Sequence, residues 1–272
     1  MPYPRRRKPG DGPSRRERRD AMLAPGAIIA AVTPDARDPS CVHVRIGRRS
    51  AAKIPAEGDL GPAALGLAAG VVLTEPLIAL VRRAQAQTLA RYWALRLLSR
   101  AAQSRAGLIL KLQRKGIEAP VARDIALQLE ARSLLDDRRY AESIVAAELR
   151  RKPAGERLLE TKLRVKGIES RLAREVVAAA LADQRERLIE RAALSAAPTR
   201  RRAAKSSSRD HPDDAAVLEP VVRMAQRKFR AIQGRVDDRT AQRRIYGLLA
   251  RRGFDADTCA RVTRQVCTPS DA

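Results

Sequence analysis

A short helical ending recurs three times along this chain and limits what the chain can fold into. Residues 111–117 read Lys-Leu-Gln-Arg-Lys-Gly-Ile, residues 162–168 read Lys-Leu-Arg-Val-Lys-Gly-Ile, and residues 248–254 read Leu-Leu-Ala-Arg-Arg-Gly-Phe. In each copy a Leu lies four residues before the Gly, a basic residue directly precedes the Gly, and a large apolar residue follows it.

Each part of this pattern is typical of the end of a packed helix. The Leu faces the core, and the basic residue stabilises the negative end of the helix dipole. A Gly can adopt the left-handed conformation that ends a helix, and the apolar residue after it closes the turn. We therefore expect helices to end at Gly116, Gly167 and Gly253. A further apolar residue lies nine positions beyond each Gly, at Ile125, Val176 and Val262. The repeat predicts three helix-turn-helix units.

Helical patterns fill the chain from residue 104 onward. We predict that Ser104 caps the first of these helices and that Asp136 or Asp137 caps a later one, with Tyr140 packed inside. The predicted helices span residues 104–115, 120–132, 136–150, 156–166, 170–182, 183–196, 215–232, 238–252 and 256–267.

The N-terminal part of the chain follows a different pattern. Val42, Val44 and Ile46 alternate with more polar neighbours, which is the period of a strand, and residues 27–55 can form a small antiparallel sheet. A helical pattern runs from residue 75 to about residue 97, with Thr74 as its cap and a break expected near Ala86. The fold class predicted is mainly α, with three tandem three-helix repeats and a small β-containing N-terminal extension.

Changes in composition suggest the domain boundaries. Charged, Pro-rich or Ser-rich stretches with few apolar residues are typical of flexible segments. The predicted order is a disordered basic arm (1–26), a small β-sheet plus helix extension (27–86), repeat 1 (87–152), repeat 2 (153–196), a flexible insertion (197–214) and repeat 3 (215–272).

The formal net charge of +24 makes an anionic partner the leading expectation. Nucleic acid comes first and a membrane surface second, while a generally basic, Arg-rich proteome could also account for the charge. The binding candidates are basic residues at equivalent places in the repeats, although solvated helix faces would look similar. These candidates are Lys111, Lys115, Arg150, Arg151, Lys162, Lys166, Arg251 and Arg252.

The sequence offers little support for catalysis, a cofactor or a metal. Three Cys and two His residues show no ligand spacing, and reduced thiols fit a cytoplasmic protein. Cys259 and Cys267 fit small core residues on one face of the last helix. Asp136 and Asp137 form the one tempting carboxylate pair, but a metal-dependent nuclease needs several convergent carboxylates. Residues 63–81 are apolar but interrupted, so we expect no membrane span.

Several of these residues resemble the RecX family. Residues 136–141 read Asp-Asp-Arg-Arg-Tyr-Ala, and a basic run, a Gly at 155 and the 162–168 copy follow. The C-terminal copy is similar to the third repeat of that family. The resemblance covers residues 88–267, and residues 27–85 resemble an extension found on longer members. The chain departs from the family pattern at residues 105–107, where an acidic residue is usual, and in the long 197–214 insertion.

The resemblance, rather than composition or spacing, implies a partner. RecX proteins regulate the RecA recombinase, so the expected partners are the RecA filament and single- and double-stranded DNA. The resemblance implies three modules in a curved array that binds in the groove of the filament. It also implies that the protein inhibits recombination without being an enzyme and without a cofactor. We expect the protein to be a monomer. The alternative is a helical protein that binds nucleic acid without a recombinase partner.

Overall fold

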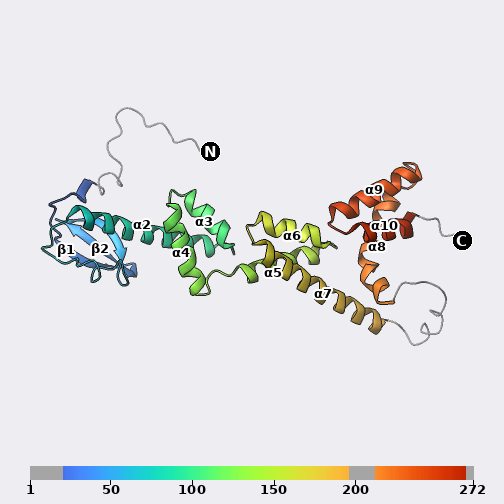
Figure 1. Ribbon diagram of the computed structural model, residues 1–272, viewed down its shortest axis with the longest axis horizontal. Coiled ribbons are helices and arrows are strands. Elements are labelled where there is room, and N and C mark those ends of the chain that lie inside the picture. The colour runs from blue at the N-terminus through green and yellow to red at the C-terminus, as the bar shows by residue number, and fades with distance from the viewer. Residues whose placement is uncertain (1–20, 196–211, 268–272) are drawn as a thin grey trace, which may run out of the picture. The chain divides into compact units, whose positions relative to one another are not determined.

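The computed structural model describes residues 21–195 and 212–267, and its described elements are three strands and nine helices (Figure 1). The chain divides into two compact units. The first contains the N-terminal sheet and the helices up to residue 134, and the second contains residues 102–107 and the helices from residue 135 onward. Residues 1–20 of the predicted basic arm (1–26) lie outside the described residues. So do residues 197–211 of the predicted insertion (197–214).

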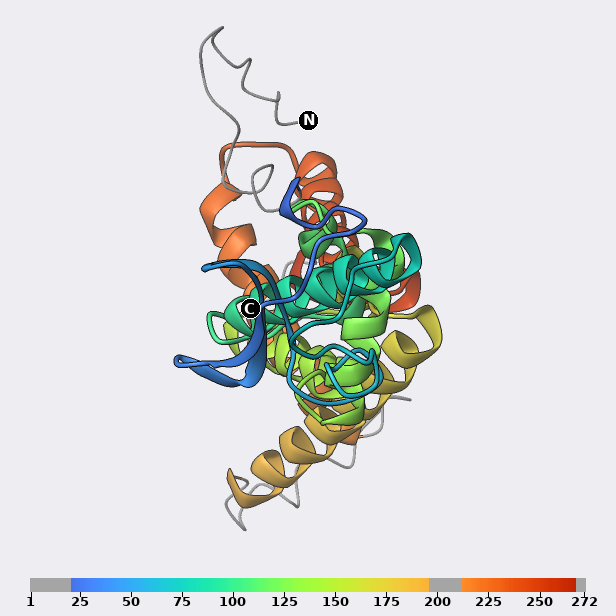
Figure 2. The same ribbon diagram turned by 90° about the vertical axis from the view of Figure 1, so that its left-hand side faces the viewer.

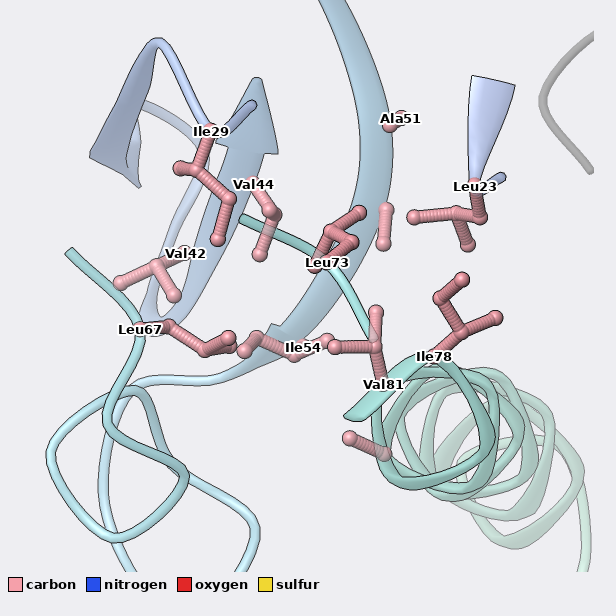
Figure 3. Packing of buried hydrophobic residues seen from close by; sticks show 12 residues of the cluster. Leu23, Ile29, Val42, Val44, Ala51, Ile54, Leu67, Leu73, Ile78 and Val81 are labelled. Carbon is pink, nitrogen blue, oxygen red and sulfur yellow. The ribbon is translucent and has the colours of Figure 1, made fainter. Parts of the chain in front are cut away.

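The first unit begins with the small antiparallel sheet that the alternating pattern predicted. Its strands are β1 (Ala31–Asp35), β2 (Asp38–Ile46) and β3 (Arg49–Pro55), paired in the order β1-β2-β3. Val44 is fully buried, whereas its neighbour His43 lies on the polar face. Figure 3 shows Val44 and Ile54 of the sheet in one core with Ile78 and Val81 of the following helix. Leu23 belongs to the same core, although we assigned it to the arm.

Helix α2 (Glu75–Leu98) is continuous, and the break expected near Ala86 is absent. The residues around that position favour a helix, because Ala has the highest helix propensity and no Gly or Pro interrupts the middle of α2. Thr74 occupies the N-cap position, but its side chain makes no capping hydrogen bond. After Val81, the buried residues of α2 are all alanines: Ala84, Ala90 and Ala94.

The first helical module combines α2 with α3 (Arg105–Gln113) and α4 (Ala119–Ala131). Ser104 caps α3 as predicted, because its Oγ accepts a hydrogen bond of 3.0 Å from the backbone N–H of Gly107. Leu108, Leu112 and Ile125 are buried, and α4 packs against α2. This module therefore takes one of its helices from the segment that follows the sheet.

The second module consists of α5 (Asp137–Arg151), α6 (Glu156–Val165) and α7 (Ser170–Ser195). Its core joins Val145 of α5 to Leu163 of α6 and Val176 of α7. Helix α5 thus packs in the second module, not in the first to which its sequence position assigned it. Helix α7 is also a single helix, not the two predicted over 170–182 and 183–196 (Figure 1 and Figure 2). Asp183 is exposed, so it remains within a helix without burying its charge.

The third module follows the sequence prediction closely. Its helices are α8 (Pro212–Ile232), α9 (Asp238–Arg251) and α10 (Ala256–Cys267), and α8 begins within the last residues of the predicted insertion. Cys259 is buried in the core of this module, as predicted, whereas Cys267 is partly buried and packs against that core.

The three predicted helix endings are present and have one geometry. Gly116, Gly167 and Gly253 have φ angles of +81°, +81° and +83°. The backbone N–H after each Gly donates to the carbonyl of the Leu four residues before that Gly, with distances of 3.2, 3.1 and 3.3 Å. Those three Leu residues are fully buried. This is the Schellman arrangement, in which a left-handed residue satisfies the last carbonyls of a helix.

Candidate binding surface of the helical modules

The predicted binding residues lie at or just beyond the ends of four helices, α3, α5, α6 and α9. Five of these side chains are exposed: Lys115, Arg150, Arg151, Lys166 and Arg251. The other three are partly covered: Lys111, Lys162 and Arg252. Basic residues at these places stabilise the negative helix ends whether or not they also bind a partner.

Two of the predicted residues converge on one buried carboxylate. Lys162 Nζ lies 2.5 Å from Glu148 Oε2, and Arg252 Nη1 lies 3.2 Å from Glu148 Oε1. Glu148 is only 9% exposed. The hydrogen bond from Lys162 and the charge of Arg252 hold the pKa of Glu148 below its usual value, against the opposing effect of burial. Lys162 and Arg252 therefore neutralise a buried acid and are less available to a partner than their sequence positions suggest.

Arg252 also joins the second and third modules. Its Nε and Nη2 donate to the Pro153 carbonyl at 2.9 and 2.7 Å. Its own carbonyl accepts a hydrogen bond of 2.8 Å from the backbone N–H of Gly155. A Cβ on Gly155 would lie 2.2 Å from the Gly253 carbonyl oxygen, so only Gly permits this approach. The module junction therefore depends on one arginine and two glycines.

Glu148 was not among the residues predicted from the sequence, although the sequence contains a signal for it. Ala141, Val145 and Glu148 follow the i, i+4, i+7 spacing of one helix face, and the first two are fully buried. An acid on such a face needs a basic partner, because an isolated buried charge is costly. The spacing could thus have predicted a buried ion pair, but not which of the many basic residues completes it.

The end of α5 carries three consecutive exposed basic residues: Arg150, Arg151 and Lys152. None of them forms an ion pair with a residue in the described part of the chain. We call these three residues the α5 basic end. Their charges remain available to an anionic partner, unlike those of Lys162 and Arg252.

The tempting carboxylate pair is used for capping. Asp136 Oδ1 accepts a hydrogen bond of 2.9 Å from the Arg139 backbone N–H, and Asp137 Oδ1 accepts one of 2.7 Å from the Arg105 backbone N–H. Tyr140 packs half-buried against the module core. Within residues 21–195 and 212–267, no group of His, Cys, Asp or Glu is arranged to hold a metal ion. Over the same residues, no helix has the length and apolar character that a bilayer crossing requires.

A second feature that sequence analysis missed lies on the first module. Lys115 Nζ sits 4.6 Å from the centre of the Trp93 ring, and the Arg96 guanidinium sits 5.6 Å from it. Lys115 was selected only for its place before Gly116. An aromatic pair inside a basic, acid-free segment was the signal that could have identified this cluster.

Comparison with known proteins places these modules in a family. Three family models match: RecX first three-helix domain (residues 90–127), RecX second three-helix domain (136–177) and RecX third three-helix domain (221–263). The second match begins at α5, in agreement with the packing of that helix.

Relatives that match more than half of the chain agree with the domain matches. The regulatory protein RecX of Mycobacterium sp. (strain KMS) is 30% identical over 165 residues, which cover 61% of this chain and 74% of the relative. That of Chlorobium phaeobacteroides (strain BS1) is 26% identical over 173 residues, which cover 64% of this chain and 90% of the relative. A crystal structure of a regulatory protein RecX shares the fold, with a TM-score of 0.62 and 17% identity over 87% of this chain and 98% of the other. With three domain matches in order and these relatives, the chain belongs to the RecX family of regulatory proteins.

Proposed function

We propose that this chain binds the RecA–DNA filament and lowers the activity of the recombinase, without catalysing a reaction itself. Membership of the RecX family supports RecA as the regulated protein. The observation that supports binding by this chain is the α5 basic end, where Arg150, Arg151 and Lys152 are exposed and free of ion pairs within the described residues. Arginine forks suit both phosphates and carboxylates, so the filament offers two kinds of anionic contact.

The exposure of the predicted side chains supports a binding surface smaller than the full set of eight residues. Lys115, Lys166 and Arg251 remain candidates together with the α5 basic end, because their side chains are exposed. Lys162 and Arg252 have structural contacts, and their mutation would disturb the fold as well as any binding. Lys111 is partly covered and has contacts of its own, so it is a weaker candidate.

A matched pair of double variants tests the proposal. We expect Arg150→Glu with Arg151→Glu to weaken binding to RecA filaments assembled on single-stranded DNA, and to raise the concentration needed for half-inhibition of strand exchange. The control is Arg48→Glu with Arg49→Glu, which changes two exposed arginines of the N-terminal extension and alters the net charge equally. Circular dichroism should show unchanged helical content in both.

Two outcomes would contradict the proposal. If the Arg150/Arg151 variant inhibits strand exchange at wild-type concentrations, the binding surface lies elsewhere. If the wild-type chain binds DNA but leaves RecA activity unchanged, the alternative of a general nucleic-acid-binding protein replaces it.

A further inference from the structure

The segment between the sheet and α4 combines a strong positive charge with a complete lack of acids. Residues 76–117 contain nine Arg and Lys residues and no Asp or Glu. The segment includes nearly all of α2 and the whole of α3. No carboxylate within the segment can therefore neutralise its basic side chains, and its charge favours an anionic ligand.

Two aromatic side chains lie within this basic segment. Tyr92 is 54% exposed, and its ring meets that of Trp93 edge to face, with 5.4 Å between the centroids and 71° between the planes. Arg96 Nη1 donates a hydrogen bond of 2.9 Å to the Tyr92 hydroxyl. Arg96 and Lys115 also lie over the Trp93 ring, at 5.6 and 4.6 Å from its centre. We call Tyr92, Trp93, Arg96 and Lys115 the aromatic-basic cluster.

Packing of the core does not explain the position of Tyr92. Its ring contacts Trp93, its hydroxyl accepts a hydrogen bond from Arg96, and more than half of its surface faces solvent. The hydrogen bond to its hydroxyl and the contact with Trp93 hold the ring in place, so an exposed aromatic side chain lies beside two cations. A fixed, exposed aromatic ring beside basic side chains is the combination that binds unpaired bases together with their phosphates.

We propose that the aromatic-basic cluster binds single-stranded DNA, with one exposed base stacked on Tyr92 and the flanking phosphates contacted by Arg96 and Lys115. Stacking requires a base whose face is accessible, so a single strand should bind better here than a duplex. An acidic protein surface would explain the cations but not the ring. This inference adds a DNA site on the first module to the proposed function, and it can be tested without RecA, so that the two can fail separately.

Trp93 provides a direct readout, because it is the single Trp of the chain. The full-length chain is titrated with a short oligothymidylate and with a duplex of equal length, following Trp emission and the anisotropy of a labelled strand. We expect Tyr92→Leu to weaken single-strand binding about fivefold or more, which is the lower end of the effect of losing one stacked base. Tyr92→Phe keeps the ring and should stay within about twofold of the wild type, and the duplex affinity of Tyr92→Leu should change less than about twofold.

A second pair of variants separates stacking from general effects. Leu95→Ala removes a 40% exposed apolar side chain from the same helix and should leave single-strand affinity unchanged. Arg96→Gln should weaken single-strand binding, because it removes a phosphate contact and the anchor of the Tyr92 hydroxyl. Unchanged melting temperatures would show that the two Tyr92 variants, Leu95→Ala and Arg96→Gln all fold.

The proposal would be overturned in any of three cases. Tyr92→Leu could bind the oligothymidylate as tightly as the wild type. It could lose single-strand and duplex affinity equally, or Leu95→Ala could weaken binding as much as Tyr92→Leu. A Tyr92→Leu variant that keeps its DNA affinity but inhibits RecA less would show that the cluster contacts protein instead.

Discussion

Glu148 shows how one residue can change the interpretation of its basic neighbours. As sequence positions, Lys162 and Arg252 looked equivalent to Lys115 and Lys166, because all lie near a helix-ending Gly. In the structure, Lys162 and Arg252 hold a carboxylate that is buried on the inner face of α5. The charge pattern of a sequence cannot distinguish a basic residue that stays exposed from one that forms an ion pair inside the fold.

We predict that Glu148→Gln destabilises the second unit by about 1.5–3 kcal/mol, the usual range for hydrogen bonds to charged groups. The amide keeps the shape of Glu148 but leaves Lys162 and Arg252 without a compensating charge. Urea unfolding at pH 7 measures the loss. The control is Glu175→Gln, which removes an exposed carboxylate that also pairs with two arginines and should cost much less.

The difference in unfolding free energy between the wild type and Glu148→Gln should also depend on pH. The folded-state pKa of Glu148 is lowered, chiefly by the hydrogen bond from Lys162, so its contribution is present above the unfolded-state pKa of about 4.3. The contribution is lost as the pH falls through the lower folded-state pKa. The free energy of unfolding should therefore fall more steeply with acid in the wild type than in Glu148→Gln. A difference that stays constant from about pH 6 to pH 3 would contradict this account.

At the scale of the elements, local chemistry predicted how helices end better than how they group. Gly116, Gly167 and Gly253 could be identified because a helix end requires a left-handed residue within a short stretch of chain. The grouping of α5 was not predictable in this way, because it depends on contacts with α6 and α7. The breaks expected at Ala86 and Asp183 failed for a related reason, since neither residue prevents a helix from continuing.

We predict that Ala substitutions at the three helix-ending glycines differ in cost. Gly116→Ala should lose about 1 kcal/mol from the left-handed backbone alone, because its Cβ would have no neighbour within 4 Å. Gly167→Ala should lose more, since its Cβ would lie 2.8 Å from that of Ala106. Gly253→Ala should lose most, because its Cβ would lie 2.3 Å from the Leu158 backbone nitrogen. Urea unfolding of the three variants gives the order, and equal losses would show that neighbouring contacts are unimportant.

At the scale of the whole molecule, the repeat and the charge predicted different things. The repeat predicted the helical modules, because a hydrophobic pattern that recurs along a chain produces the same packing in each copy. The net charge of +24 predicted an anionic partner but not which surface of the protein binds it. Arg150 and Arg151 were already binding candidates in the sequence, but the structure distinguishes them, as exposed residues, from Lys162 and Arg252, which pair with Glu148. The aromatic-basic cluster was not predicted, because it depends on which side chains meet after packing.

We propose that this chain acts on RecA and does not merely coat DNA. The most direct measurement is three-strand exchange driven by RecA, titrated with the wild-type chain, beside annealing of the same strands without RecA. We predict that strand exchange and RecA ATP hydrolysis fall at concentrations of the chain that leave most of the DNA unbound and annealing unaffected. If both reactions instead slow together, and only once the DNA is saturated, the chain blocks DNA alone and the account is wrong.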